Sequence, residues 1–201
     1  MTTATYQPKA DEVKRLREQT EAPMMACRNA LVAAAGDFDK AKAVLLERGA
    51  AQAQKKAERA ANEGMVASYI HAGGKIGVLV EVNSETDFVA RNPKFVDLCR
   101  DIAMHVAAMS PQYLDREGVP AEAVQAARDE FAANVPAGKP PEVVQKIIDG
   151  KLNKWYEERC LLDQPFVKDD GMSVGDLIKN AVGVLGENIR VRRFTKYALG
   201  E

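Results

Sequence analysis

The side chains best suited to acid–base or metal chemistry are few and widely spaced in this 201-residue chain. Its two histidines, His71 and His105, belong to no HExxH, GxSxG or paired metal-ligand motif. The three cysteines, at positions 27, 99 and 160, form no CxxC pair, and this spacing predicts neither a zinc site nor a disulfide framework. We therefore expect no metal, no cofactor and no catalytic chemistry of the chain's own.

Two features that resemble active-site parts have simpler explanations. Gly73-Gly74 lacks the GxxxxGK[ST] pattern of a phosphate-binding loop and fits a hairpin turn. His105 falls within an apolar helical stripe, which favours a half-buried histidine over a ligand. An enzyme that used His105 with Asp87 would also lack a third group to orient them.

One segment is harder to explain by packing alone, the sequence EVNSETDFVAR of residues 81–91. It places a carboxylate, Asp87, and a large apolar ring, Phe88, on what should be an exposed turn between a strand and a helix. In one interpretation Asp87 caps the loop and Phe88 folds back onto the core. In the other, Phe88 stays exposed and gains about 1.5–3 kcal/mol of burial in the pocket of a partner.

The hydrophobic pattern predicts the elements around this turn. Residues 9–49 favour three short helices, with Thr20 as a cap for the second and Asp37 as the cap of the third. Gly49 is expected to end the third helix. Residues 50–62 are rich in alanine and charge, which favours a solvated helix acting as a semi-rigid connector.

The period then changes to two, which is typical of strands. Residues 65–71 and 76–83 are expected to form a hairpin, and residues 189–197 a last strand. One face of the second strand carries four apolar side chains: Ile76, Val78, Val80 and Val82. With a single layer of helices, we expect this sheet to need further cover, and a two-fold homodimer would supply it.

Helices are predicted in the rest of the chain. One opens at Asn92-Pro93, with an apolar stripe of Phe95, Leu98, Ile102, Val106 and Met109. Residues 120–135 and 142–159 should form an antiparallel pair around the turn of residues 137–141, and a final helix follows Ser173. The fold class is therefore α+β, with a three-stranded antiparallel sheet, helices and a protruding helical pair.

These elements suggest a division into a three-helix module of residues 1–52, a helical linker of residues 53–63 and a core of residues 64–201, which includes the helical hairpin 120–159. The formal net charge of −1 gives no basic excess for direct nucleic-acid binding. No apolar run reaches 18 residues and the first residues lack a signal-peptide core. We expect a cytoplasmic protein that touches no membrane.

The segment Thr86-Asp87-Phe88-Val89 resembles the signature of the elongation factor Ts family, and it follows a hairpin as it does in that family. Five further segments resemble the family in the same order: residues 16–31, 102–108, 138–140, 164–167 and 186–189. The resemblance thus covers nearly the whole chain.

The chain departs from the family at two positions and resembles its short form. The family usually has small residues, often glycine, where this chain has Glu21 and Pro23, and these could alter the contact of the loop before Met24. A single Thr-Asp-Phe-Val hairpin matches the short members, which complete their core by pairing two copies.

The resemblance implies a guanine-nucleotide exchange factor for elongation factor Tu, in its GDP-bound and nucleotide-free states. Residues 86–89, hereafter the wedge, would dislodge the elements that hold magnesium. Arg17, Met24 and Met25, on a module similar to ubiquitin-associated domains, would contact the nucleotide domain, and His105 is a possible second contact. The alternative is an adaptor without exchange activity, in which that module binds a helical or ubiquitin-like ligand and the rest is a dimerising scaffold.

Overall fold

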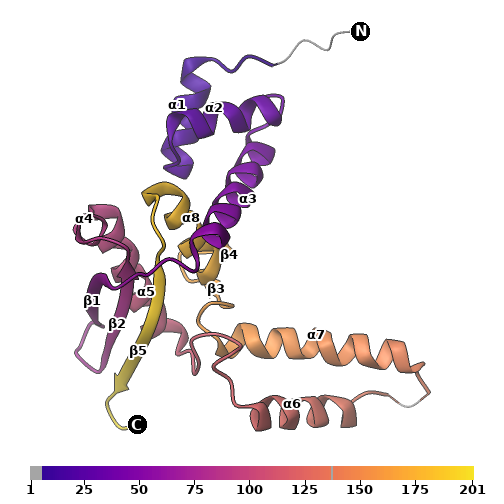
Figure 1. Ribbon diagram of the computed structural model, residues 1–201. Coiled ribbons are helices and arrows are strands. Elements are labelled where there is room, and N and C mark those ends of the chain that lie inside the picture. The colour runs from indigo at the N-terminus through magenta and orange to yellow at the C-terminus, as the bar shows by residue number, and fades with distance from the viewer. Residues whose placement is uncertain (1–5, 137) are drawn as a thin grey trace. The chain divides into compact units, whose positions relative to one another are not determined.

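The computed structural model describes residues 6–136 and 138–201, so Ala137 of the expected turn lies outside the described residues. Figure 1 shows the described chain as a mixture of helices and strands, the expected α+β class. The chain divides into two compact units. The first unit holds the N-terminal region up to Met65 with Val82–Leu98 and Asp176–Arg190, and the second holds Val66–Glu81, Cys99–Gly175 and Val191–Glu201.

Three helices form the N-terminal part of the first unit: α1 (Ala10–Thr20), α2 (Met24–Ala33) and α3 (Phe38–Lys56). Their buried side chains are small or medium in size, so the core is modest: Val13, Leu16, Ala22, Cys27, Ala30, Leu31, Ala34 and Ala41. The Asp37 carboxylate accepts hydrogen bonds from the backbone N–H groups of Asp39 and Lys40, which confirms the predicted cap. The three-helix prediction is confirmed for this region.

The cap assigned to Thr20 is wrong. α1 continues through Thr20, whose hydroxyl donates to the carbonyl of Leu16 one turn earlier, and Pro23 is the N-cap residue of α2. A threonine hydroxyl bonded back to its own helix is a common alternative to capping the next one.

The prediction that Gly49 ends the third helix is also wrong. α3 runs through Gly49 to Lys56. A Cβ atom at Gly49 would lie 3.3 Å from the backbone oxygen of Lys179, and one at Gly183 would lie 3.2 Å from the Cα of Gly49. Both contacts are tight, so glycine serves here for close packing of α3 against α8 (Val174–Leu185), not as a helix stop.

The stretch after Lys56 is not the solvated helix that composition suggested. Residues 57–62 are non-helical, and side chains bond their carbonyl groups at every second position. The Asn188 amide donates to the carbonyls of Ala57 and Arg59, at 3.3 and 2.8 Å. Arg190 donates to Ala61 at 3.4 Å, and further along the chain Asn83 donates to Glu63 at 3.2 Å. Side-chain hydrogen bonds therefore hold the non-helical part of the linker at alternate residues from 57 to 63.

The main sheet has the strand order β1-β2-β5 and is built from β1 (Glu63–Ile70), β2 (Ile76–Ser84) and β5 (Arg190–Ala198), which Figure 1 labels. Val78, Val80 and Val82 are buried, as their alternation predicted. They are buried within the chain itself, so this face is not the uncovered surface that the sequence analysis offered for pairing.

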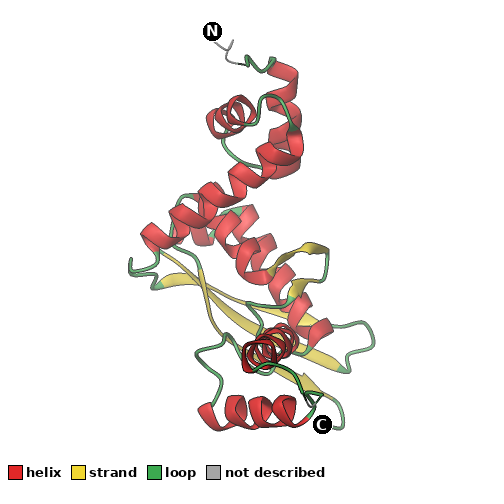
Figure 2. Cartoon of the chain, turned by 90° about the vertical axis from the view of Figure 1, so that its right-hand side faces the viewer, coloured by secondary structure: helices red, strands yellow, loops and turns green. Residues whose placement is uncertain are grey.

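A second, two-stranded sheet was missed. β3 (Pro165–Phe166) pairs antiparallel with β4 (Asp169–Ser173), visible as the small separate hairpin in Figure 2. Its strands are short and contain proline, glycine and aspartate, which are depleted in strands, so hydrophobic alternation gives no signal.

α5 (Pro93–Met109) buries most of its predicted stripe. Phe95, Leu98, Ile102 and Val106 are buried, whereas Met109 at the last position is exposed. The residue after it, Ser110, has a positive φ of 51°, and the helix ends there.

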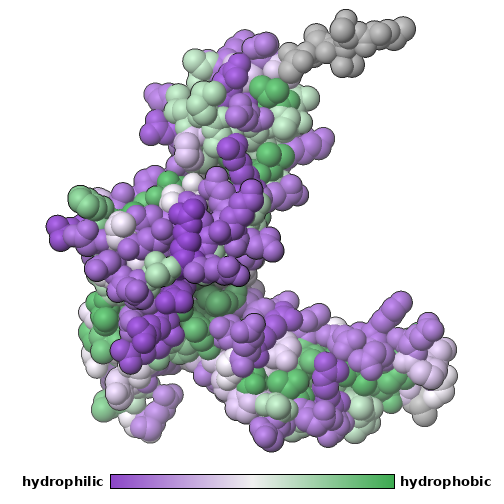
Figure 3. All heavy atoms as spheres, viewed as in Figure 1, coloured by the Kyte–Doolittle hydropathy of each residue, from purple (hydrophilic) through white to green (hydrophobic). Residues whose placement is uncertain are grey.

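α6 (Ala121–Ala133) and α7 (Pro141–Arg159) form the expected antiparallel pair in the second unit. Figure 3 shows apolar side chains along the contact between them and hydrophilic ones on the outer sides. Arg116 fastens the base of the pair: its guanidinium bonds Asp163 at 2.7 Å and Asn153 at 3.1 Å, and lies 4.7 Å from the ring centre of Tyr156.

Candidate protein-interaction site

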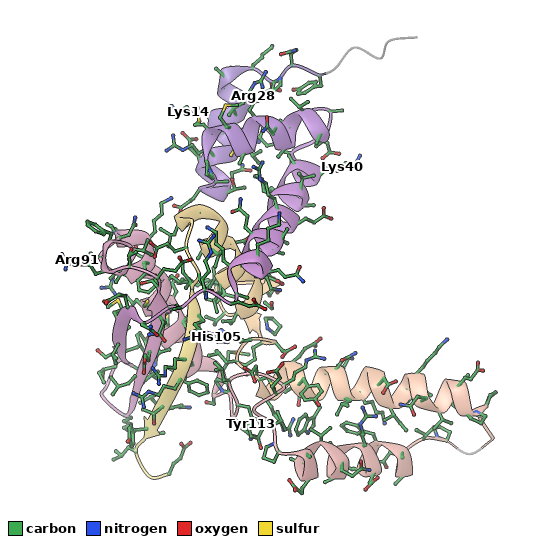
Figure 4. The ribbon with its side chains drawn as sticks, viewed as in Figure 1. Lys14, Arg28, Lys40, Arg91, His105 and Tyr113 are labelled. Atoms are coloured by element: carbon green, nitrogen blue, oxygen red, sulfur yellow. The ribbon has the colours of Figure 1, made fainter. Side chains whose placement is uncertain are left out.

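The wedge consists of the N-cap residue and the first three residues of a one-turn helix, at the place where the sequence predicts an exposed turn. β2 ends at Ser84, and α4 (Asp87–Ala90) begins after Thr86. Thr86 is the N-cap, because its hydroxyl oxygen accepts from the N–H of Val89 at 3.4 Å. Asp87 pairs with Arg91 one turn on, at 2.7 Å, and Figure 4 shows Arg91 at the outer edge of this turn.

Phe88 is the most exposed large apolar side chain of the described residues, with 83% of its surface accessible. The interpretation in which it folds back onto the core is therefore wrong for the free chain. A phenylalanine held outward on an ordered turn leaves a large apolar surface in water. Such a residue is typical of an anchor that is buried only when a partner binds.

The wedge is held from a distant part of the chain. The Glu187 carboxylate accepts from the Thr86 N–H at 3.0 Å and from the Thr86 hydroxyl at 2.7 Å. In return, Glu85 accepts from the Asn188 N–H at 2.6 Å and pairs with Arg59 at 3.5 Å. Sequence reasoning missed Glu85, Glu187 and Asn188 as supports, because about a hundred residues separate the partners.

The second predicted contact surface lies on α1 and α2, which pack against each other. Arg17 is exposed on α1, and Met24 and Met25 are exposed on α2, Met25 with 62% of its surface accessible. The same helix buries Cys27, Ala30 and Leu31. Two flexible, polarisable side chains at the start of a helix offer an adaptable apolar contact.

The departure at Glu21 has a structural basis. Glu21 adopts a left-handed conformation with φ of 55°, a geometry that glycine occupies at no steric cost. Its exposed carboxylate pairs with Lys94 at 3.1 Å. Pro23 starts α2 with φ of −55°, close to the value its ring prefers. Their effect on the contact at Met24 stays a prediction.

His105 is completely buried and belongs to the second unit, whereas the other predicted contact residues belong to the first. Its Nε2 lies 2.9 Å from Gln164 Oε1, and its Nδ1 accepts from the Val167 N–H at 3.2 Å. Nδ1 is thus the unprotonated nitrogen and Nε2 donates. Burial lowers the pKa of His105, and the bond to Gln164 opposes that shift. An effect of His105 on a partner would have to pass through its neighbours.

The sulfur and carboxylate groups form no metal site among the residues that the structure describes. All three cysteines are buried with free thiols. Burial raises the pKa of Cys99 to about 12 and that of Cys160 to about 11, so the reactive thiolate form is scarce. No helix in the described part of the chain is long and apolar enough to cross a membrane.

Comparison with known proteins agrees with the sequence signature. Residues 47–201 match the family model described as elongation factor TS. Elongation factor Ts of Thermodesulfovibrio yellowstonii is 50% identical over 192 residues, covering 96% of both chains. Those of an Anaeromyxobacter species and of Thermosipho melanesiensis are 54% and 52% identical, covering 96% and 94% of this chain and 88% and 97% of theirs. The chain therefore belongs to the elongation factor Ts family of translation elongation factors.

Proposed function

We propose that this protein is a guanine-nucleotide exchange factor that releases GDP from elongation factor Tu. The exposure of Phe88 on a capped turn is the observation that carries the proposal. The wedge of residues 86–89 enters between two helices of the partner and displaces the elements that hold magnesium and the phosphates. Magnesium neutralises phosphate charge, so loss of its support weakens GDP binding electrostatically.

The rest of the proposed contact follows the division of the chain. The module of residues 1–52 binds the nucleotide domain through Arg17, Met24 and Met25, residues 53–63 link it to the core, and the core grips a second domain of the partner. The exposed methionines support this arrangement. Coupling is reciprocal: nucleotide weakens the binding of the exchange factor by the same factor as the exchange factor weakens nucleotide binding. GTP can then displace the exchange factor.

We also propose that two copies pair through the outer face of the main sheet. Ile70 lies over Gly77, since a Cβ atom at Gly77 would be 3.1 Å from Ile70 Cδ1, and this places Ile70 on the same face as Leu79. We name this the open face, and its exposed apolar members are Val66, Ile70, Leu79 and Tyr197. Glu81 and Arg193 add an ion pair at 2.7 Å.

The exchange proposal is tested by Phe88→Ala in fluorescent GDP release from purified elongation factor Tu. We expect release to slow at least about tenfold, a loss of ~1.4 kcal/mol of coupling. The thermal midpoint of the variant should hardly move, because the ring makes little contact with its own chain. Asp87→Ala should act in the same direction but more weakly, since its partly solvated bond contributes about 0.5–1.5 kcal/mol.

The matched control is Val143→Ala, which truncates an exposed apolar side chain on α7. It should leave GDP release unchanged. A Phe88→Ala protein that loses about 3–5 kcal/mol of stability, as a core truncation would, yet exchanges normally per folded molecule would refute the wedge. The adaptor alternative predicts that even the unaltered protein leaves GDP release unaffected.

A further inference from the structure

The Glu187 carboxylate, which is distant in sequence, accepts hydrogen bonds through both of its oxygens from Thr86, the N-cap residue of α4. Glu187 Oε2 accepts from the Thr86 N–H and Glu187 Oε1 accepts from the Thr86 hydroxyl, 101 residues earlier. Among the described residues, the Glu187 carboxylate has no other hydrogen-bond or ion-pair partner. A half-buried acid that serves one residue alone is not explained by general core packing.

The bond to Glu187 fixes the direction of the Thr86 hydroxyl. With its hydrogen donated to Glu187, the oxygen is left to accept the N–H of Val89, which is the capping bond of α4. Ser84 adds to this arrangement by donating its hydroxyl to the Thr86 carbonyl at 3.0 Å. The N–H group, the hydroxyl and the carbonyl of Thr86 therefore all form hydrogen bonds.

The wedge depends on such support because α4 spans only Asp87–Ala90. A helix of one turn is unstable by itself, since nucleation costs more than one hydrogen bond returns. Phe88 is too exposed to anchor the turn through its own packing. The direction of its ring must come from the residues at the start of the turn.

We propose that Glu187 is a positioning residue for nucleotide exchange, which acts on the partner only through Thr86 and the direction of Phe88. The inference rests on the proposed exchange function. Glu85 completes a reciprocal brace, because it accepts from the N–H of Asn188 beside Glu187. Without Glu187 the turn samples several directions, and only a fraction of the molecules presents Phe88 correctly. The apparent affinity for the partner falls by that fraction.

The test is Glu187→Gln, which keeps the size of the side chain but replaces one acceptor oxygen by a donor. Glu58→Gln is the matched control, because the exposed Glu58 carboxylate bonds nothing in the described chain and lies in the same unit. GDP release from elongation factor Tu is measured over a range of exchange-factor concentrations. Glu187→Gln should raise the half-saturating concentration about fivefold and leave the maximal rate near normal, while Glu58→Gln changes neither.

Two further readouts separate positioning from a general loss of structure. Amide hydrogen exchange at residues 86–91 should be faster in Glu187→Gln, with the thermal midpoint unchanged. Thr86→Val removes the hydroxyl bond to Glu187 from the other side, together with the capping bond from Val89, and leaves the Thr86 N–H bond to Glu187 in place. If the two act through one interaction, the double variant should be no worse than the more affected single variant.

Normal half-saturation and normal amide exchange in Glu187→Gln would overturn the inference. So would a lowered thermal midpoint with normal exchange per folded molecule, since that marks a structural role only. The unaltered protein and Phe88→Ala, run in the same assay, report on the exchange function itself. If the unaltered protein does not speed GDP release, the proposed function fails. If Phe88→Ala slows release and Glu187→Gln does not, only the positioning role fails.

Discussion

Phe88 and Thr86 show what can be inferred about single residues from the sequence. Physical reasoning on the segment 81–91 left Phe88 either buried or exposed, and the family resemblance favoured exposure, which the structure bears out. Thr86 was recognised only as part of a signature. Its capping role depends on Glu187, 101 residues away, and local rules such as the capping box look three residues ahead only.

The buried histidine makes stability depend on pH. His105 has a lowered pKa in the folded chain because burial disfavours its charged form. At a pH below about 6.5, the ordinary pKa of histidine, His105 binds a proton more readily in the unfolded chain than in the folded chain. The free energy of unfolding should therefore fall with pH through this range, by at most about 1.4 kcal/mol per pH unit from this group.

The measurement is denaturant unfolding at pH 7.5 and pH 5.5, for the unaltered protein and for His105→Gln. The difference between the two pH values should shrink in His105→Gln, because the group that refuses the proton is gone. His71→Gln, a substitution at the exposed histidine, is the matched control. An undiminished difference in His105→Gln would assign the pH dependence to other groups.

Individual helices and strands were predicted well where they have a strong period, and poorly where a distant element decides their extent. The α5 stripe, the α6–α7 pair and the alternation of β2 are all visible in the residues themselves. α3 was cut short at Gly49 because a glycine after an apolar stripe is usually a stop. Its true role is the close approach to Gly183, which no window of sequence around residue 49 reveals.

The linker shows the same limit. Composition favoured a helix for residues 50–62, and helix is present only as far as Lys56. Beyond it, the side chains of Asn188 and Arg190 occupy the carbonyl groups that a helix would have used. The division of the chain at residues 52 and 63 stays a prediction.

For the molecule as a whole, the burial of one face of the main sheet determines which surface is left to pair with a second copy of the chain. Alternation along β2 predicts pairing through the face of Val78, Val80 and Val82, which the chain buries by itself. Amphipathic alternation identifies an apolar face but not what covers it. The opposite face was overlooked because its apolar residues are interrupted by glycine, serine and charge. Tyr197 on this open face has 72% of its surface accessible.

Pairing through the open face predicts a mass of twice 21.9 kDa in sedimentation at tens of micromolar. Leu79→Lys places a charge in the middle of that face, and burying it against a second copy would be costly, so the mass should return to that of one chain. Val143→Lys, an equivalent change at an exposed valine of α7, should leave the mass unchanged. A single-chain mass for the unaltered protein at this concentration would exclude the dimer.

The bonded carbonyl groups of the linker have a consequence for proteases. Trypsin cleaves after lysine and arginine, and in the non-helical stretch 57–62 the bond at risk carries the Arg59 carbonyl, the group that Asn188 holds at 2.8 Å. A protease must draw its substrate out as a free extended strand, and this strand would first have to break away from Asn188. We expect limited digestion to spare Arg59 in the unaltered protein and to cut there rapidly in Asn188→Ala. In the unaltered protein this stretch should therefore resist trypsin, although the basic residues of the linker suggest a site of easy cleavage.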